Sequence, residues 1–191
     1  MDTGNQQRLW NSALLLAIIT VFYNVFEGLI SVYFGVEDGS LTLFGFGIDS
    51  FVEVISGIGI WYMIVRSRKK ISEVHNSFEK TALRITGYSF YALVLGLLVT
   101  IAYNTITNQH PDSTFWGVVI SCISIATMVL LLTLKLRVGR KLNSSAIIAD
   151  AMCTKTCIYL SVILLLASTL YQLFNIGYID SLGSLGIAYY S

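Results

Sequence analysis

Long, nearly uncharged apolar runs constrain the fold of this chain more than any other feature of its sequence. A helix needs about 20 apolar residues to cross a ~30 Å hydrocarbon core. Only helices and closed barrels satisfy every backbone polar group in lipid, and these continuous runs lack the alternation of barrel strands. We therefore expect transmembrane helices over residues 10–35, 41–65, 82–103, 115–134, 146–174 and 178–191.

The last run, 178–191, is too short to cross a bilayer. It would cover about 21 Å as a helix. The sequence thus predicts an all-α, polytopic bundle of six transmembrane helices whose sixth helix is cut off. We expect one transmembrane domain over residues 1–191, with no cytoplasmic C-terminal domain. Of the 191 residues, 55% are hydrophobic and 12% are charged, too few charges for a soluble domain of this length.

The basic residues predict the orientation of the chain. Every Lys and Arg except Lys155 lies before the first run, around the loop after the second, or after the fourth. The positive-inside rule then places the N-terminus in the cytoplasm. A net charge of +1 gives no reason to expect a nucleic-acid partner. The expected surroundings are the lipid bilayer of the cell (plasma or inner) membrane.

Ionisable residues inside the runs are the first candidates for function, because charges in a bilayer are costly. Asp49 and Glu53 in the second run are four residues apart and share one helical face. Two carboxylates so placed need a cation or a shared proton. The expected interiors of the third and fourth runs contain no ionisable residue. The other runs with such residues are the first, with Glu27, and the fifth, with Asp150 and Lys155.

The fifth run repeats the spacing with two cysteines. Cys153 and Cys157 are also four residues apart, and Asp150, Thr154 and Ser161 extend their polar stripe. A buried cysteine alone is more often packing than ligand. Its combination with an acidic pair on another helix favours the ligand interpretation.

Glu27 lies on a face of the first run that also carries Asn24. Glu27 and Asp49 are each eight residues from the loop between their runs, roughly 12 Å deep. They could therefore face each other, although a buried, protonated Glu27 bonded to a neighbour is an equally good interpretation. Lys155 is expected to snorkel or to pair with another helix.

This arrangement resembles the cation diffusion facilitator family of divalent-metal/proton exchangers. That family has six spans, and its transport site joins D-x-x-x-D on span two to H-x-x-x-D on span five. Here the small-residue lead-in Gly39-Ser40-Leu41-Thr42-Leu43 precedes Asp49-x-x-x-Glu53, and Ala149-Asp150 precedes Cys153-x-x-x-Cys157. Cysteines replace the family's His and Asp on span five, and Glu27 stands where span one usually has a basic residue. The resemblance implies a divergent member, with a homodimer as the expected assembly.

The donor set predicts which ion is carried. Two carboxylates and two thiolates suit tetrahedral Zn²⁺, and thiolates disfavour Mg²⁺ and Ca²⁺. The predicted metal ligands are Asp49, Glu53, Cys153 and Cys157, and the candidates for carrying protons or supporting those ligands are Glu27, Asp150, Asn24 and Thr154. Ligands lose protons when they bind metal, so metal uptake and proton release are coupled.

The predicted function is therefore a zinc/proton antiporter that exports metal from the cytoplasm, with Zn²⁺ or another divalent transition metal as cargo and no prosthetic group. One alternative is a membrane metal-binding or regulatory protein that does not transport. Another is a small-molecule/proton exchanger, against which the cysteine pair speaks. An enzyme is not expected, because neither His75 nor His110 lies in a span and no Ser-His-Asp arrangement is visible.

Overall fold

The computed structural model of the chain contains four long helices in the part that it describes, and no strand there. It describes residues 3–67, 80, 84, 87–88, 91, 94–95 and 115–174. The helices are α1 (Thr3–Glu37), α2 (Leu41–Ser67), α4 (Phe115–Leu142) and α5 (Ser145–Phe174). All four are long and apolar enough to cross a membrane. The all-α membrane fold is thus confirmed, while the predicted spans 82–103 and 178–191 fall largely or wholly outside the described residues.

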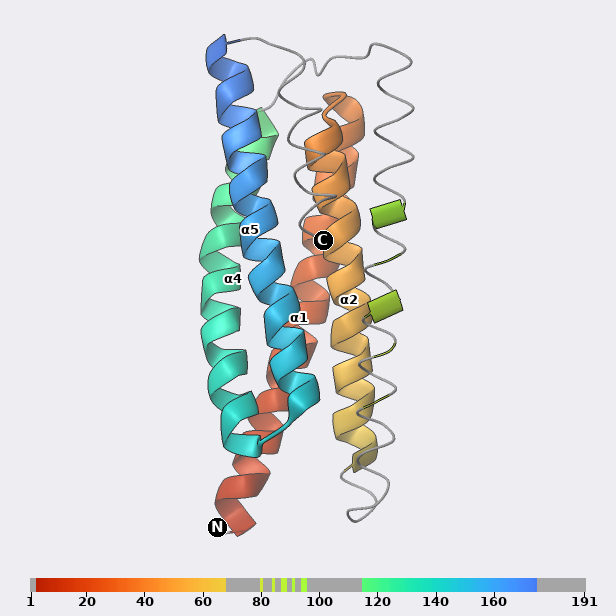
Figure 1. Ribbon diagram of the computed structural model, residues 1–191, viewed down its shortest axis with the longest axis vertical. Helices are drawn as coiled ribbons and strands as arrows, with labels where there is room; N and C mark the ends of the chain where they lie inside the picture. The colour runs from red at the N-terminus through yellow and green to blue at the C-terminus, as the bar shows by residue number, and fades with distance from the viewer. Residues whose placement is uncertain are drawn as a thin grey trace.

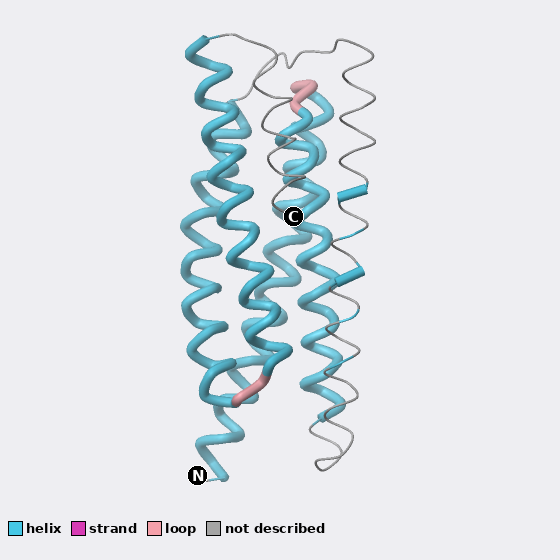
Figure 2. The backbone as a smooth tube through the Cα atoms, viewed as in Figure 1, coloured by secondary structure: helices cyan, strands magenta, loops and turns pink. Residues whose placement is uncertain are grey.

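The four helices form an antiparallel bundle of two helical hairpins (Figure 1). Helix α1 packs most extensively on α2, and α4 on α5. The hairpins then meet through smaller contacts of α1 with α4 and of α2 with α5. The start of α1, the end of α2 and the α4–α5 turn lie at the same end of the bundle (Figures 1 and 2).

Each hairpin turn is short, and the sequence at each turn explains why. Gly39 and Asn143 adopt positive φ angles of 67° and 50°, conformations that glycine and asparagine accept readily. The residue after each then caps the next helix. Ser40 Oγ accepts a hydrogen bond from Leu43 N, and Ser144 Oγ caps α5 in the same way.

Glycines allow α1 and α2 to approach closely near their turn. A Cβ added to Gly35 would lie 2.6 Å from the backbone nitrogen of Phe44, and one on Gly47 would lie 2.8 Å from that of Val32. Small residues at such contacts are typical of helices packed within membranes. This end of the first hairpin is therefore fixed by backbone-to-backbone packing.

The bundle has an apolar exterior and an interior that mixes apolar and polar side chains. Large side chains such as Leu15, Phe22 and Phe26 are more than half exposed. The buried side chains include many hydroxyl, amide and charged groups. This distribution suits a lipid environment, because an exposed apolar surface is the favourable one there.

One predicted boundary is wrong in a way that matters for function. The fourth span was expected to end at 134, but α4 continues to Leu142 and only two residues separate it from α5. Lys135 therefore belongs to a helix interior, not to a cytoplasmic loop. It is 1% exposed, so the expectation that the fourth span has no internal charge is also wrong.

Candidate metal site

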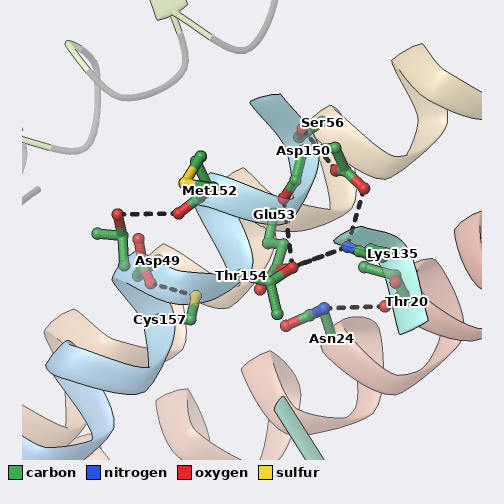
Figure 3. Close-up of polar contacts among 11 residues, drawn as sticks. Thr20, Asn24, Asp49, Glu53, Ser56, Lys135, Asp150, Met152, Thr154 and Cys157 are labelled. Atoms are coloured by element: carbon green, nitrogen blue, oxygen red, sulfur yellow. Dashed lines mark hydrogen bonds and ion pairs between the residues drawn. The ribbon is translucent and has the colours of Figure 1, made fainter. Parts of the chain in front are cut away.

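Asp49 and Glu53 of α2 face Cys157 and Thr154 of α5 in the interior of the bundle (Figure 3). The thiol of Cys157 donates a hydrogen bond to Oδ2 of Asp49, with the two atoms 2.8 Å apart. Both side chains are buried. Cys157 also lies within interaction range of Glu53, one turn further along α2. The contact of Cys157 with Asp49 thus joins one member of each predicted ligand pair.

Glu53 is held by α5 and by the unexpected lysine of α4. The hydroxyl of Thr154 donates to Glu53 Oε1, and it accepts a hydrogen bond from Lys135 Nζ at 2.8 Å. Lys135 Nζ is also 3.6 Å from Glu53 Oε1. The other carboxylate oxygen of Glu53, Oε2, is buried and has no hydrogen-bond partner among the described residues.

Asp150 forms the second half of this polar group. Its Oδ2 lies 2.9 Å from Lys135 Nζ, and its Oδ1 accepts a hydrogen bond of 2.9 Å from Ser56. Cys153, one turn along α5, is buried within interaction range of Asp150, Glu53 and Lys135. We call the whole set the central polar cluster: Asp49, Glu53, Ser56, Lys135, Asp150, Cys153, Thr154 and Cys157.

Glu27 of α1 lies beside this cluster rather than in it. Its two carboxylate oxygens accept hydrogen bonds from Tyr23, at 2.9 Å, and from Ser50, at 3.1 Å. Ser50 follows Asp49 in α2, so Glu27 lies beside the segment that carries the acidic pair. The buried, hydrogen-bonded Glu27 that was considered as one interpretation matches this geometry, and a part in proton movement stays a prediction.

Asn24 supplies a second polar group from α1. Its amide nitrogen donates to the carbonyl oxygen of Thr20, and its Oδ1 has no hydrogen-bond partner among the described residues although it is buried. Such orphaned oxygens inside a membrane bundle are costly unless a ligand, an ion or a water satisfies them.

In this arrangement the polar groups of the cluster bond largely to one another, although Glu53 Oε2 has no hydrogen-bond partner among the described residues. Within the described residues, no three His, Cys, Asp or Glu side chains are gathered closely enough to hold a metal ion. Among the four predicted ligands, Asp49 and Cys157 are joined by a hydrogen bond, and the convergence of all four on one point stays a prediction. Binding an ion would require the hydrogen bonds of Asp49, Glu53 and Cys157 to be exchanged for metal ligation.

Lys135 is the charged residue of the central polar cluster that the sequence analysis missed. It was counted with the basic residues of a loop, because the apolar run before it ends at Leu134. A signal was nevertheless present in the helical spacing. The buried residues of α4 include Ser121, Ser124, Met128, Leu131, Lys135 and Val138, each three or four residues after the last.

The bundle and its buried charges define a polytopic helical membrane protein with an ionisable centre, the class that includes transporters of ions. Charged groups that face a bundle interior mark ion and proton pathways in such proteins. A family model described as the cation efflux transmembrane domain matches residues 13–191. The chain belongs to this family, the cation diffusion facilitators, whose members are metal cation transporters rather than enzymes. Among curated proteins, none matches the sequence.

Proposed function

We propose that this chain is a zinc/proton antiporter that exports Zn²⁺ from the cytoplasm through a site between α2 and α5. The observation that carries the proposal is the contact of Cys157 with Asp49, which brings a thiol and a carboxylate together inside the membrane. Glu53 adds a carboxylate oxygen with no hydrogen-bond partner in the described structure, one helical turn away. Cys153 is the proposed fourth ligand.

Coupling to protons follows from the chemistry of this contact. The Cys157 thiol must lose its proton before the sulfur can ligate an ion. Its hydrogen bond to Asp49 is lost at the same time, which frees a carboxylate oxygen as a second ligand. The arrival of Zn²⁺ thus releases protons, and the return of protons from the other side favours release of the metal.

The proposed direction of transport depends on the orientation of the bundle. Arg140 and Lys141 lie in the last turn of α4, at the end of the bundle where α1 starts and α2 ends. The positive-inside rule assigns this end to the cytoplasm. The α1–α2 turn, with Glu37 and Asp38, is then on the outer side of the plasma or inner membrane.

The test is metal-dependent proton flux in proteoliposomes containing the whole chain. Vesicles loaded with a zinc-sensitive or a pH-sensitive dye would be exposed to Zn²⁺, Cd²⁺, Mn²⁺, Fe²⁺ or Co²⁺. We expect Zn²⁺ to enter as protons move in the opposite direction, and Asp49→Asn to abolish both signals. Binding of Zn²⁺ without flux would instead establish the non-transporting alternative, and proton flux driven only by organic cations would establish the small-molecule exchanger.

A further inference from the structure

Lys135 places a positive charge beside the proposed metal site. The residue is 1% exposed, and its ammonium group lies between one carboxylate of α2, Glu53, and one of α5, Asp150. From Phe115 to Leu134, the part of α4 before it contains no Asp, Glu, Lys or Arg. A buried charge of this kind is costly unless it is paired, so its position reflects the two carboxylates.

The two carboxylates hold Lys135 unequally. Its contact with Asp150 is short, at 2.9 Å, and Ser56 fixes the other oxygen of the same carboxylate. Its distance to Glu53 is 3.6 Å, and the hydroxyl of Thr154 bridges the two groups. Asp150 is thus the anchor of the lysine, while Glu53 is its weaker partner.

A metal ion and Lys135 would compete for Glu53. Both are cations, and in a low-dielectric interior two positive charges near one carboxylate repel each other strongly. Zn²⁺ bound to Glu53 would weaken the contact of this carboxylate with the ammonium group. The stronger contact with Asp150 allows Lys135 to give up Glu53 and still remain paired.

We propose that Lys135 is a built-in competitor of the transported cation: it occupies Glu53 when the site is free of metal, and its return to Glu53 promotes release of the ion. Asp150 forms the stronger ion pair with Lys135 and therefore limits the competition of the lysine for Glu53. The proposal rests on the proposed function, because Glu53 must be a metal ligand. It assigns to Lys135 and Asp150 opposite effects on metal affinity.

The experiment measures the equilibrium affinity of the whole, detergent-solubilised chain for Zn²⁺ at one fixed pH, by competition with a zinc-sensitive dye. Lys135→Met removes the competing charge at similar length, so Zn²⁺ should bind more tightly, by roughly 5- to 150-fold if the coupling is of ordinary size. Asp150→Asn leaves Lys135 with Glu53 alone, so Zn²⁺ should bind more weakly. The double variant should resemble Lys135→Met.

A lysine that only supports the fold gives a different pattern. Both single variants would then bind Zn²⁺ more weakly or unchanged, and that result for Lys135→Met would overturn the proposal. If Lys135→Met does not fold, the double variant is used in its place, because the double variant removes one charge of each sign and so leaves the net charge of the cluster unchanged. Its affinity for Zn²⁺ is then compared with that of Asp150→Asn. Tighter binding by the double variant supports the proposal, and equal or weaker binding overturns it.

The matched control is Lys155→Met on α5. Lys155 is exposed and its Nζ lies 5.6 Å from the centre of the Tyr159 ring, so it should not change the affinity. The transport assay separates this inference from the proposed function. Intact Zn²⁺ binding without flux would overturn transport alone, whereas wild-type flux with no tightening in Lys135→Met would overturn only the role of Lys135.

Discussion

The thiol of Cys157 and the carboxylate of Asp49 lie 2.8 Å apart and join α5 to α2 in the interior of the bundle. These two residues are separated by 108 positions in the chain. Each also has a chemically similar residue four positions away on its own helix, Cys153 and Glu53. The contact therefore aligns the two pairs, and the first prediction concerns its removal.

Cys157→Ala should lower the rate of Zn²⁺ transport by at least roughly 10- to 100-fold. Loss of a group that merely hydrogen-bonds a metal ligand already has an effect of this size, and Cys157 is a proposed ligand itself. The substitution removes a proposed ligand and leaves Asp49 without its donor. Initial rates of Zn²⁺ uptake into dye-loaded proteoliposomes measure the effect. Cys122→Ala is the control, because Cys122 is an exposed free cysteine on α4. Wild-type rates in Cys157→Ala would mean that the cysteine only packs.

The cysteines should also set the choice between metals. Thiolates are softer than imidazole or carboxylate, so the wild-type chain should favour Zn²⁺ and Cd²⁺ over Mn²⁺. The double variant Cys153→His, Cys157→Asp should keep Zn²⁺ transport and lose part of the preference for Cd²⁺. Uptake rates for the three ions, measured in one vesicle preparation, give the ratios. An unchanged ratio of Cd²⁺ to Zn²⁺ would contradict ligation by sulfur.

The proposed orientation predicts a labelling pattern in intact cells. Single cysteines would be placed at Arg140 and at Glu37 in a background that carries Cys122→Ser. A membrane-impermeant maleimide should label position 37 from outside and position 140 only after the cells are opened. The remaining cysteines, Cys153 and Cys157, are buried and should stay unlabelled. Labelling of position 140 in intact cells would reverse the orientation and the direction of transport.

Gly35→Ala should destabilise the first hairpin. The added Cβ would lie 2.6 Å from the nitrogen and 2.7 Å from the Cα of Phe44, and these backbone atoms can move only if the helices separate. Overpacking of this kind typically costs about 1–3 kcal/mol. Thermal unfolding in detergent should show a lower midpoint than for the wild type. Leu15→Ala, at a position that is 58% exposed, should shift the midpoint less.

The sequence was sufficient to predict the two helices of the first hairpin and the helix faces on which their polar residues lie. Apolar runs predicted 10–35 and 41–65, and the structure has Thr3–Glu37 and Leu41–Ser67. A spacing of four residues correctly placed Asp49 and Glu53 on a buried face. Both inferences succeed because they depend on local geometry, which the bilayer leaves little freedom to change.

The sequence was not sufficient to predict which side chains on different helices contact one another. Lys135 follows an apolar run, and a lysine in that position is usually a loop residue that marks the cytoplasmic side. Its true environment depends on Glu53 and Asp150, which belong to two other helices. The choice of Thr154 rather than Cys153 as the direct partner of Glu53 likewise depends on how α5 is rotated against α2.

The division of the bundle into two hairpins has a consequence for movement. Within the first hairpin, glycines bring the backbones of α1 and α2 together, so a movement that keeps this packing carries both helices as a unit. Between the hairpins, the contacts in the interior include the hydrogen bonds and ion pairs of the central polar cluster. The interface between the two hairpins is thus held partly by the side chains that the transported ion would bind. Binding and release of the ion would therefore also change how strongly the two hairpins adhere to each other.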